Sequence, residues 1–216
     1  VAYGKSLEVS KKYENIIEDS KRVFWANNFN KGVNLFNRAT TATDPDSIEN
    51  YFNLSISAFE TAIKIEPDSA DTYKNLAFAY MNMQKHDDAI QPLKKLIELE
   101  NAVDGYRFLG EIYHDLGLMH KENYEASGIE KDSLKAMEYF QKTIDLLEKG
   151  REFYPEDSSI LLYLSNAYIN ADKIDVAINA FRAGVEQEPE NKYYRYNYGV
   201  LLLQANDYEE AVKQFI

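Results

Sequence analysis

The chain has 216 residues, of which 45% are hydrophobic and 28% charged, a balance that predicts an ordered protein with a sizeable core. Its 36 acidic and 24 basic residues give a formal charge of −12, which disfavours nucleic acid and anionic membrane surfaces as partners. The lack of cysteine excludes disulfides, cysteine-bound metals and thiol nucleophiles, and no apolar run approaches the roughly 20 residues that insertion across a membrane needs.

Residues 1–24 are predicted to form a long N-terminal helix, because residues 5–24 contain neither glycine nor proline. Apolar side chains recur there at mostly helical spacing: Leu7, Tyr13, Ile16, Ile17 and Phe24. We expect this helix to be continuous, or nearly so, with the next one. We also expect it to cap the core of the helices that follow, because a helical array needs covered ends.

The segment from residue 73 to residue 100 predicts two helices joined by a tight turn. Apolar or small residues recur at helical spacing in each half, as Tyr73, Leu76, Ala77 and Tyr80, then Ala89, Leu93 and Leu96. A polar break at residues 84–86 separates the halves. The small residues Ala77 and Ala89 indicate places where helices cross closely.

The same pattern recurs along the chain, and signals for β-strands are essentially lacking, so the fold class is predicted to be all-α. Five units follow one another after the N-terminal helix: residues 25–69, 70–102, 103–157, 158–191 and 192–216, the last truncated. The first and third units carry insertions between their helices. Residues 114–132, the second insertion, are too apolar to hang free and are expected to fold against the array as helix extensions or a small lip.

The stretches "YKNLAFAY…AIQPL", "YRFLGEIY…AMEYF" and "LLYLSNAY…AINAF…P" resemble the signature of the tetratricopeptide repeat, with a period of about 34 residues. The resemblance implies a right-handed superhelical solenoid of about five repeats that forms a single domain over residues 1–216. It further implies a concave groove, lined by the first helix of each repeat, that receives a peptide or another protein.

The groove positions implied by this resemblance are rich in aromatic and amide side chains. Asparagine can bond a ligand backbone, aromatic rings offer flat apolar contact, and Lys74 and Arg107 could pair with a carboxylate. Alternatively, Asn75 and Asn197 belong to the framework of the repeat. The candidate residues are Asn30, Lys74, Asn75, Phe78, Arg107, Phe108, Tyr163, Asn166, Asn170, Tyr196 and Asn197. Members of this family that clamp the carboxylate tails of heat-shock chaperones need asparagine at the positions that Phe78 and Phe108 occupy here. This chain is therefore not expected to bind those tails.

Candidates for catalysis or metal binding are few. Glu111 precedes His114 by three residues, a spacing found in di-metal helices, but that chemistry needs a second such pair, which neither His86 nor His120 provides. All three histidines are therefore expected to be solvated residues on helix surfaces. The sequence predicts no catalytic site, no metal and no cofactor, and it favours a scaffold that binds a protein or peptide.

An alternative function is self-association. The last helix ends in "AVKQFI", which is expected to leave Val212, Phe215 and Ile216 without a neighbour unless further repeats follow or a homo-oligomer forms. On compartment, the missing start methionine and the lack of cysteine favour an exported, periplasmic protein of a bacterium, although a cytoplasmic one fits nearly as well.

Overall fold

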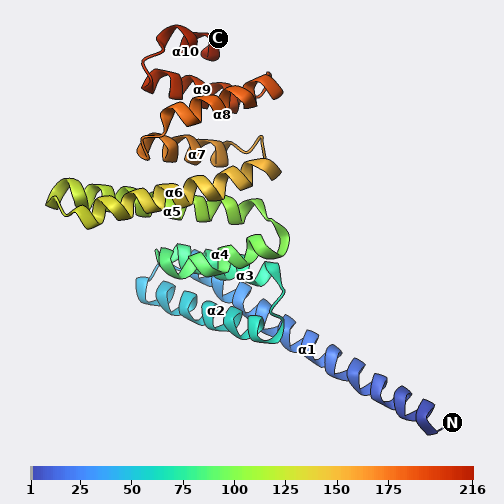
Figure 1. Cartoon of the computed structure of the whole chain (residues 1–216). Helices are drawn as coiled ribbons and strands as arrows, with labels where there is room; N and C mark the ends of the chain where they lie inside the picture. The colour runs from blue at the N-terminus through green and yellow to red at the C-terminus, as the bar shows by residue number, and fades with distance from the viewer. Residues whose placement is uncertain (1) are drawn as a thin grey trace. The chain divides into compact units, whose positions relative to one another are not determined.

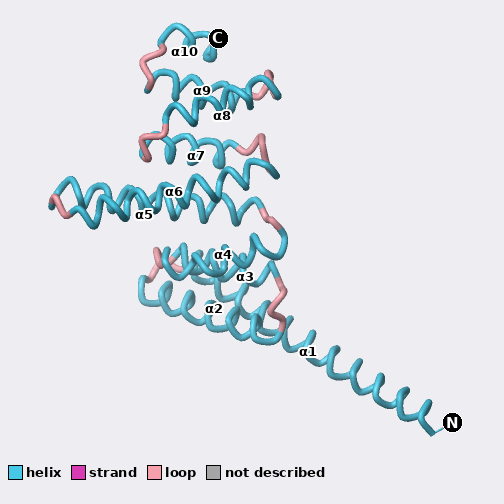
Figure 2. The backbone as a smooth tube through the Cα atoms, in the orientation of Figure 1, coloured by secondary structure: helices cyan, strands magenta, loops and turns pink. Residues whose placement is uncertain are grey.

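The computed structural model describes residues 2–216, with side chains described from Tyr13 onward. Within these residues every regular element is a helix, which confirms the all-α prediction (Figures 1 and 2). The helices are α1 (Ala2–Thr41), α2 (Pro45–Ile65), α3 (Ala70–Asn82), α4 (His86–Glu100), α5 (Val103–Ser127), α6 (Glu130–Phe153), α7 (Ser158–Asn170), α8 (Ile174–Gln187), α9 (Lys192–Gln204) and α10 (Tyr208–Phe215).

The helices form two compact units, unit 1 over residues 1–100 and unit 2 over residues 101–216. Within them, neighbouring helices pack as helix-turn-helix pairs, and each of the five ranges expected for a repeat holds one pair. The right-handed superhelix and the single domain over residues 1–216 stay predictions.

The tight turns inside three pairs use residues other than glycine in the left-handed backbone conformation. Gln84, Asp172 and Asn206 have φ of 58°, 55° and 62°. Asparagine and aspartate tolerate this conformation better than other residues with a Cβ, because their short polar side chains bond locally. The turn geometry therefore survives without the glycine that is usual at this position in the repeat.

Unit 1 has a core in which small residues let helices approach. Ala77 of α3 and Ala89 of α4 are fully buried, as expected for residues at a helix crossing. Gly32 of α1 lies directly against the buried ring of Phe59 on α2, and the Ser55 hydroxyl donates to the Gly32 carbonyl at 2.8 Å. The register between α1 and α2 is thus set by both packing and a hydrogen bond.

The long N-terminal helix is confirmed, since α1 runs without a break for 40 residues. Its expected capping role is wrong for residues 13–24. Their side chains, Tyr13 and Phe24 included, are exposed or nearly so, and Figure 1 shows this part of α1 extending beyond α2 and α3. Leu7 lies outside the described side chains.

Residues 13–24 do not need to cap the first helix pair, because α1 has a polar surface in its C-terminal half. Asn27, Asn30, Lys31, Asn34 and Arg38 lie on one side of the helix and are exposed to solvent. The other side turns Trp25 and Phe29 towards the core, where the Trp25 indole donates to the Thr72 hydroxyl at 3.2 Å. The first helix pair therefore needs no additional cover on its polar side.

In unit 2 the second insertion folds as helix extensions, as predicted. It lengthens α5 and α6, which join through Gly128 in the left-handed conformation at φ 70° (Figure 2). Figure 1 shows the joined ends projecting beyond α7. His120 holds this extension together, because its Nδ1 lies 2.9 Å from Asp132 Oδ1 and its ring stacks on Tyr139.

The first helices of the three pairs in unit 2 lie in the order α5, α7, α9. Helix α7 contacts α5 and α9, while α6 and α8 also pack against this row. This arrangement leaves one long side of α7 and of α9 without a covering helix, and it positions the candidate site.

Candidate functional site

Asp157 fixes the start of α7 and ties it to α5. Its carboxylate, only 5% exposed, accepts the backbone N–H groups of Ser159 and Ile160 at 3.1 and 3.0 Å. It also accepts Arg107 Nε at 2.7 Å and a second bond from Arg107 Nη2. The hydrogen bond to Asp157 raises the pKa of the Arg107 guanidinium. Arg107 is thus paired with a carboxylate of the protein itself.

A second set of contacts joins α5 to α7 farther along. The Tyr163 ring packs against that of His114 on α5, with the ring centroids 5.5 Å apart. Burial, followed by the charge of Glu111, raises the pKa of Tyr163. Lys121 Nζ donates to Asn170 Oδ1 at 3.0 Å, and Asn170 Nδ2 donates to the Asn166 carbonyl at 3.0 Å. Of the predicted binding residues, Tyr163 and Asn170 therefore hold helices together.

Asn197 performs the same task between α7 and α9. The Ser165 hydroxyl donates to Asn197 Oδ1 at 2.9 Å, and Asn197 Nδ2 donates to the Tyr193 carbonyl at 2.9 Å. The side chain is buried with both ends of its amide bonded. The structure therefore favours the framework role for Asn197 over the ligand role.

The uncovered sides of α7 and α9 are mostly apolar. On α7 these positions have spacing i, i+4, i+7, and on α9 they have spacing i, i+3, i+7, i+10, which places each set on one side of its helix. We call these residues the apolar face: Leu162, Asn166 and Ile169 of α7, with Tyr193, Tyr196, Val200 and Leu203 of α9. Leu162, Tyr196 and Leu203 are 45%, 57% and 41% exposed.

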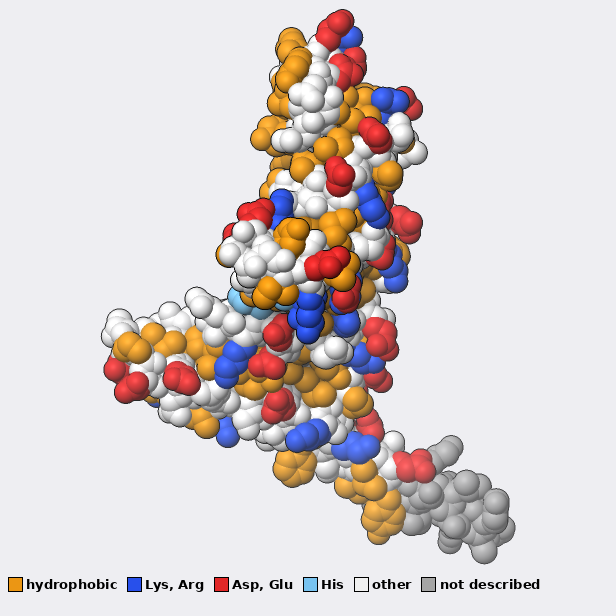
Figure 3. Space-filling view, turned by 60° about the vertical axis from the view of Figure 1, so that its left-hand side comes forward, with side chains coloured by type: hydrophobic (Ala, Val, Ile, Leu, Met, Phe, Trp, Pro, Cys, Tyr) orange, Lys and Arg blue, Asp and Glu red, His pale blue; other side chains and the backbone are white. Residues whose placement is uncertain are grey.

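The apolar face brings together Asn166 and Tyr196 from the predicted set, which lacks the other five members of the face: Leu162, Ile169, Tyr193, Val200 and Leu203. Leucine, isoleucine and valine on a helix normally indicate core. The signal that could have found them is their position outside the Leu-small-Tyr stripe that each repeat buries. Figure 3 shows hydrophobic side chains reaching the surface at the C-terminal end of unit 2.

The remaining predicted residues lie outside the apolar face. Lys74, Asn75 and Phe78 are half-buried on α3 of unit 1, where the Lys74 ammonium lies 5.7 Å from the centroid of the Phe78 ring. Asn75 Nδ2 donates to the Asp71 carbonyl at 2.8 Å. Phe108 is half-buried on α5 in unit 2, whereas Asn30 belongs to the polar surface of α1.

The prediction of three solvated histidines is wrong for two of them. His86 is exposed, whereas His120 is half-buried by its contacts within the α5–α6 extension. His114 is only 6% exposed, with its ring packed against those of Phe140 and Tyr163. Its nitrogens make no hydrogen bond, although Nδ1 lies 3.5 Å from a carboxylate oxygen of Asp115. Helix packing overrides the usual surface preference of histidine here.

Among residues 13–216, whose side chains the structure describes, no group of three or more acidic or histidine side chains could hold a metal ion. None of the described helices is both long enough and apolar enough to cross a membrane.

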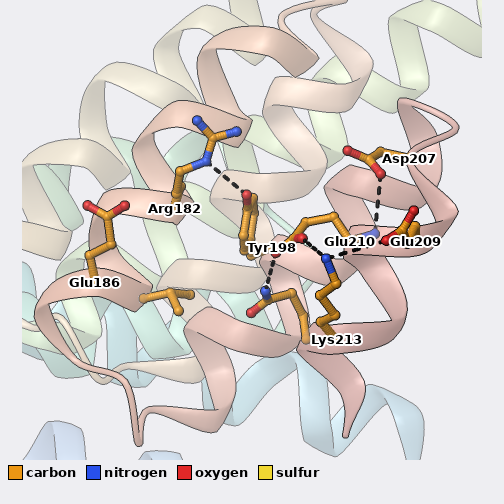
Figure 4. Close-up of a pocket in the computed structure, with 9 residues that line it drawn as sticks. Arg182, Glu186, Tyr198, Asp207, Glu209, Glu210 and Lys213 are labelled. Atoms are coloured by element: carbon orange, nitrogen blue, oxygen red, sulfur yellow. Dashed lines mark hydrogen bonds and ion pairs between the residues drawn. The ribbon is translucent and has the colours of Figure 1, made fainter.

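A depression lies between α8 and α10, on the side of α9 that carries Tyr198 (Figure 4). Arg182 Nε donates to the Tyr198 hydroxyl at 3.0 Å, Lys213 Nζ lies 2.9 Å from Glu210 Oε2, and Asp207 accepts the Glu210 N–H at 3.2 Å. These polar groups bond one another. Most of the residues that line the depression are charged, unlike those of the apolar face.

Three partly buried tyrosines have raised pKa values, so the stability of the protein should depend on pH. Burial, then the hydrogen bond to Glu60 at 3.0 Å, raises the pKa of Tyr80 to about 12, and burial also raises the pKa of Tyr163 and of Tyr168. Unfolded tyrosines titrate near about pH 10. Above that pH the unfolded chain loses protons that the folded chain keeps. The free energy of unfolding should therefore keep its highest value below about pH 10 and decrease towards about pH 12. Urea titrations at a series of pH values measure this free energy.

Tyr80→Phe is the matched control for this pH dependence, because it removes one titrating group and leaves the ring. It should make the fall in the free energy of unfolding above about pH 10 less steep. An unfolding free energy that stays constant between about pH 9 and about pH 11.5 would contradict the prediction.

Comparison with known proteins agrees with the repeated helix pairs. Two family models described as "Tetratricopeptide repeat" match residues 147–216 and 58–91. The peroxisomal targeting signal receptor of Candida albicans is 22% identical over 183 residues, which cover 74% of this chain and 31% of that protein. The interferon-induced protein with tetratricopeptide repeats 2 of Mus musculus is 26% identical over 156 residues, with 72% and 33% covered. The chain spans about a third of the length of these relatives.

Solved structures share the fold at low sequence identity. MamA from Desulfovibrio magneticus superposes with a TM-score of 0.51 at 16% identity, covering 86% of this chain and 91% of that one. These matches identify tetratricopeptide repeats at residues 58–91 and 147–216, in a chain whose paired helices have the fold of that repeat.

Proposed function

We propose that the chain is a non-catalytic scaffold or adaptor that binds a segment of another protein on the first helices of its repeats. The observation that carries this proposal is the apolar face of α7 and α9. Leu162 and Tyr196 are about half exposed there, at regular spacing on neighbouring helices. A contiguous apolar surface of this kind in a folded protein typically marks a binding site.

The face is suited to a peptide backbone as well as to side chains. The side chain of Asn166 is half-buried between the exposed apolar residues, and an amide can donate to and accept from a ligand backbone. Tyrosine rings add contact area at low entropic cost. Arg107, on the neighbouring helix α5, already bonds Asp157 within the protein.

Serine substitutions in the face test this proposal. A double variant, Leu162→Ser with Tyr196→Ser, should lose the proteins that the wild-type chain retains in a quantitative pull-down from its native lysate. The control is Val176→Ser, which changes an equally exposed apolar residue (56%) on α8. Circular dichroism checks that both variants are folded. If the double variant and the control retain the same proteins at the same levels, the apolar face is not the binding surface.

Self-association is the second candidate function, because α10 exposes Val212, Phe215 and Ile216. The Phe215 ring covers Gly199 on one side and meets Tyr196 edge-on at 5.9 Å, while the rest of it is exposed. If the mass measured by light scattering rises with concentration and Phe215→Glu abolishes the rise, association through α10 is supported. A constant monomer mass rejects it.

A further inference from the structure

Three neighbouring helices of unit 2 differ in the charge that they present beside the apolar face. We infer that this surface selects a segment of about six residues whose bulky apolar side chains cover α7 and α9 and whose basic side chains lie over α5. The inference rests on the proposed binding function and specifies the chemistry of the partner.

The contacts of α7 show how the three helices share one surface. Tyr163 and Asn170 point towards α5, since the Tyr163 ring packs against that of His114 and Asn170 bonds Lys121. Ser165 points towards α9, since it bonds Asn197. Successive residues of a helix are about 100° apart. Leu162, Asn166 and Ile169 therefore lie on the side of α7 between its two neighbours, and the apolar face continues directly to the α5 edge.

The α5 edge of this surface is acidic. Asp115 has a side chain that is 64% exposed, and Glu111 lies one turn before it. Arg107 is paired with Asp157 and lies 3.8 Å from Asp104, which balances its charge. Lys121 keeps its charge but is directed towards Asn170 of α7. Around Glu111 and Asp115 the edge therefore has a negative potential that favours a cationic partner.

The other parts of the surface have different charge. Helix α7 has no charged residue. At the start of α9 the Lys192 ammonium lies 5.2 Å from the centroid of the Tyr193 ring, and Glu156, Glu188 and Glu190 line the same depression, so that end has mixed charge. The surface thus runs from negative on α5, through apolar on α7, to apolar with mixed charge on α9. A segment with basic residues at one end fits best with that end over α5.

The size of the segment follows from helix spacing. Packed helices lie about 8 to 10 Å apart, so the distance from α5 to α9 is about 16 to 20 Å. An extended chain covers about 3.3 Å per residue, which gives about six residues. The favoured ligand is accordingly short, with apolar or aromatic residues followed by lysine or arginine. The segment needs no acidic residue.

Selection from a random peptide library tests the inference. Peptides of about 12 residues, displayed on phage, are selected on the wild-type chain, and the affinities of synthetic winners are measured by fluorescence anisotropy. We expect winners in which apolar residues are followed by basic ones. Asp115→Lys should weaken their binding about three- to tenfold at low salt, and the effect should shrink at about 0.5 M salt, where charges are screened. Asp175→Lys on α8 is the matched control and should leave the affinity unchanged.

The outcomes separate the inference from the proposed function. Winners that lose binding in Leu162→Ser with Tyr196→Ser but are acidic or uncharged, and are indifferent to Asp115→Lys, overturn the inference and leave the proposed function standing. Winners that ignore the double variant, or a library that yields no binder, contradict both. Winners with basic residues whose affinity falls in both variants support both.

Discussion

Replacing Asp157 by alanine should lower the free energy of unfolding of unit 2 by about 2 to 4 kcal/mol. The change removes the acceptor for two backbone N–H groups at the start of α7 and the partner of Arg107. Loss of a helix cap costs about 0.5 to 2 kcal/mol, and loss of one partner of a buried ion pair costs about 3 to 5 kcal/mol. We expect less than the full sum because the Arg107 side chain, 40% exposed, can turn to water. Urea denaturation followed by circular dichroism measures it.

Two variants apportion this effect. Asp157→Asn keeps a capping oxygen but loses the charge, so it should cost less than Asp157→Ala. Arg107→Gln leaves Asp157 with its two backbone donors and should also be intermediate. If Asp157→Ala unfolds at the same urea concentration as the wild-type chain, the assigned role of Asp157 is wrong.

Replacing Gly32 by alanine should also destabilise the protein, by about 2 kcal/mol in unit 1. A Cβ at this position would lie 2.5 Å from Cε1 of Phe59, whose ring is fully buried and has no space to move into. Overpacking of this kind costs about 1 to 3 kcal/mol, more than the benefit of about 1 kcal/mol that alanine brings to a helix. The midpoint of thermal or urea unfolding measures the difference.

Gly199→Ala is the matched control. The added Cβ would lie at the same distance from a neighbouring ring, but that ring is exposed rather than buried. Its Cβ would also lie 2.5 Å from a ring carbon, Cζ of Phe215, but that ring is 45% exposed and can swing into solvent. Gly199→Ala should therefore be neutral or stabilising by up to about 1 kcal/mol. Equal losses in both variants would show that the freedom of the neighbouring ring does not decide the cost.

Much of the fold could be predicted from the sequence, because each repeat marks its own helices. The buried alanines Ala77 and Ala89 appear where a close crossing needs them, and the polar breaks at Gln84, Asp172 and Asn206 become left-handed turns. The apolar insertion also folds into longer helices, since those residues could not remain in water. All of these predictions depend on local periodicity, which a single sequence displays directly.

The candidate site could be predicted only in part, because its contacts join residues far apart in the chain. Arg107 bonds Asp157, which is 50 residues away, and Ser165 bonds Asn197, which is 32 residues away. Nothing in the spacing of residues within one helix indicates such pairs. A residue that looks available for a ligand in the sequence can therefore be a tie between helices in the structure.

Burial was the other source of error, in both directions. His114 is a polar residue that packing places in the interior, and Leu162 and Leu203 are apolar residues that packing leaves outside. Residues 13–24 read as an apolar stripe but remain exposed, because the polar surface of α1 makes a cover unnecessary. Amphipathic spacing shows which side of a helix is apolar, but the neighbours decide whether that side is covered.

Photo-crosslinking at two tyrosine positions tests most directly whether a partner binds on α7 and α9. A photoreactive phenylalanine derivative is placed at Tyr196 in the apolar face or, as the control, at Tyr208 on α10, which is exposed to a similar degree (57% and 60%). A peptide selected by the wild-type chain should crosslink through its apolar residues at Tyr196 and remain unlinked at Tyr208. Crosslinking at Tyr208 alone, or equally at both positions, would contradict binding on the apolar face.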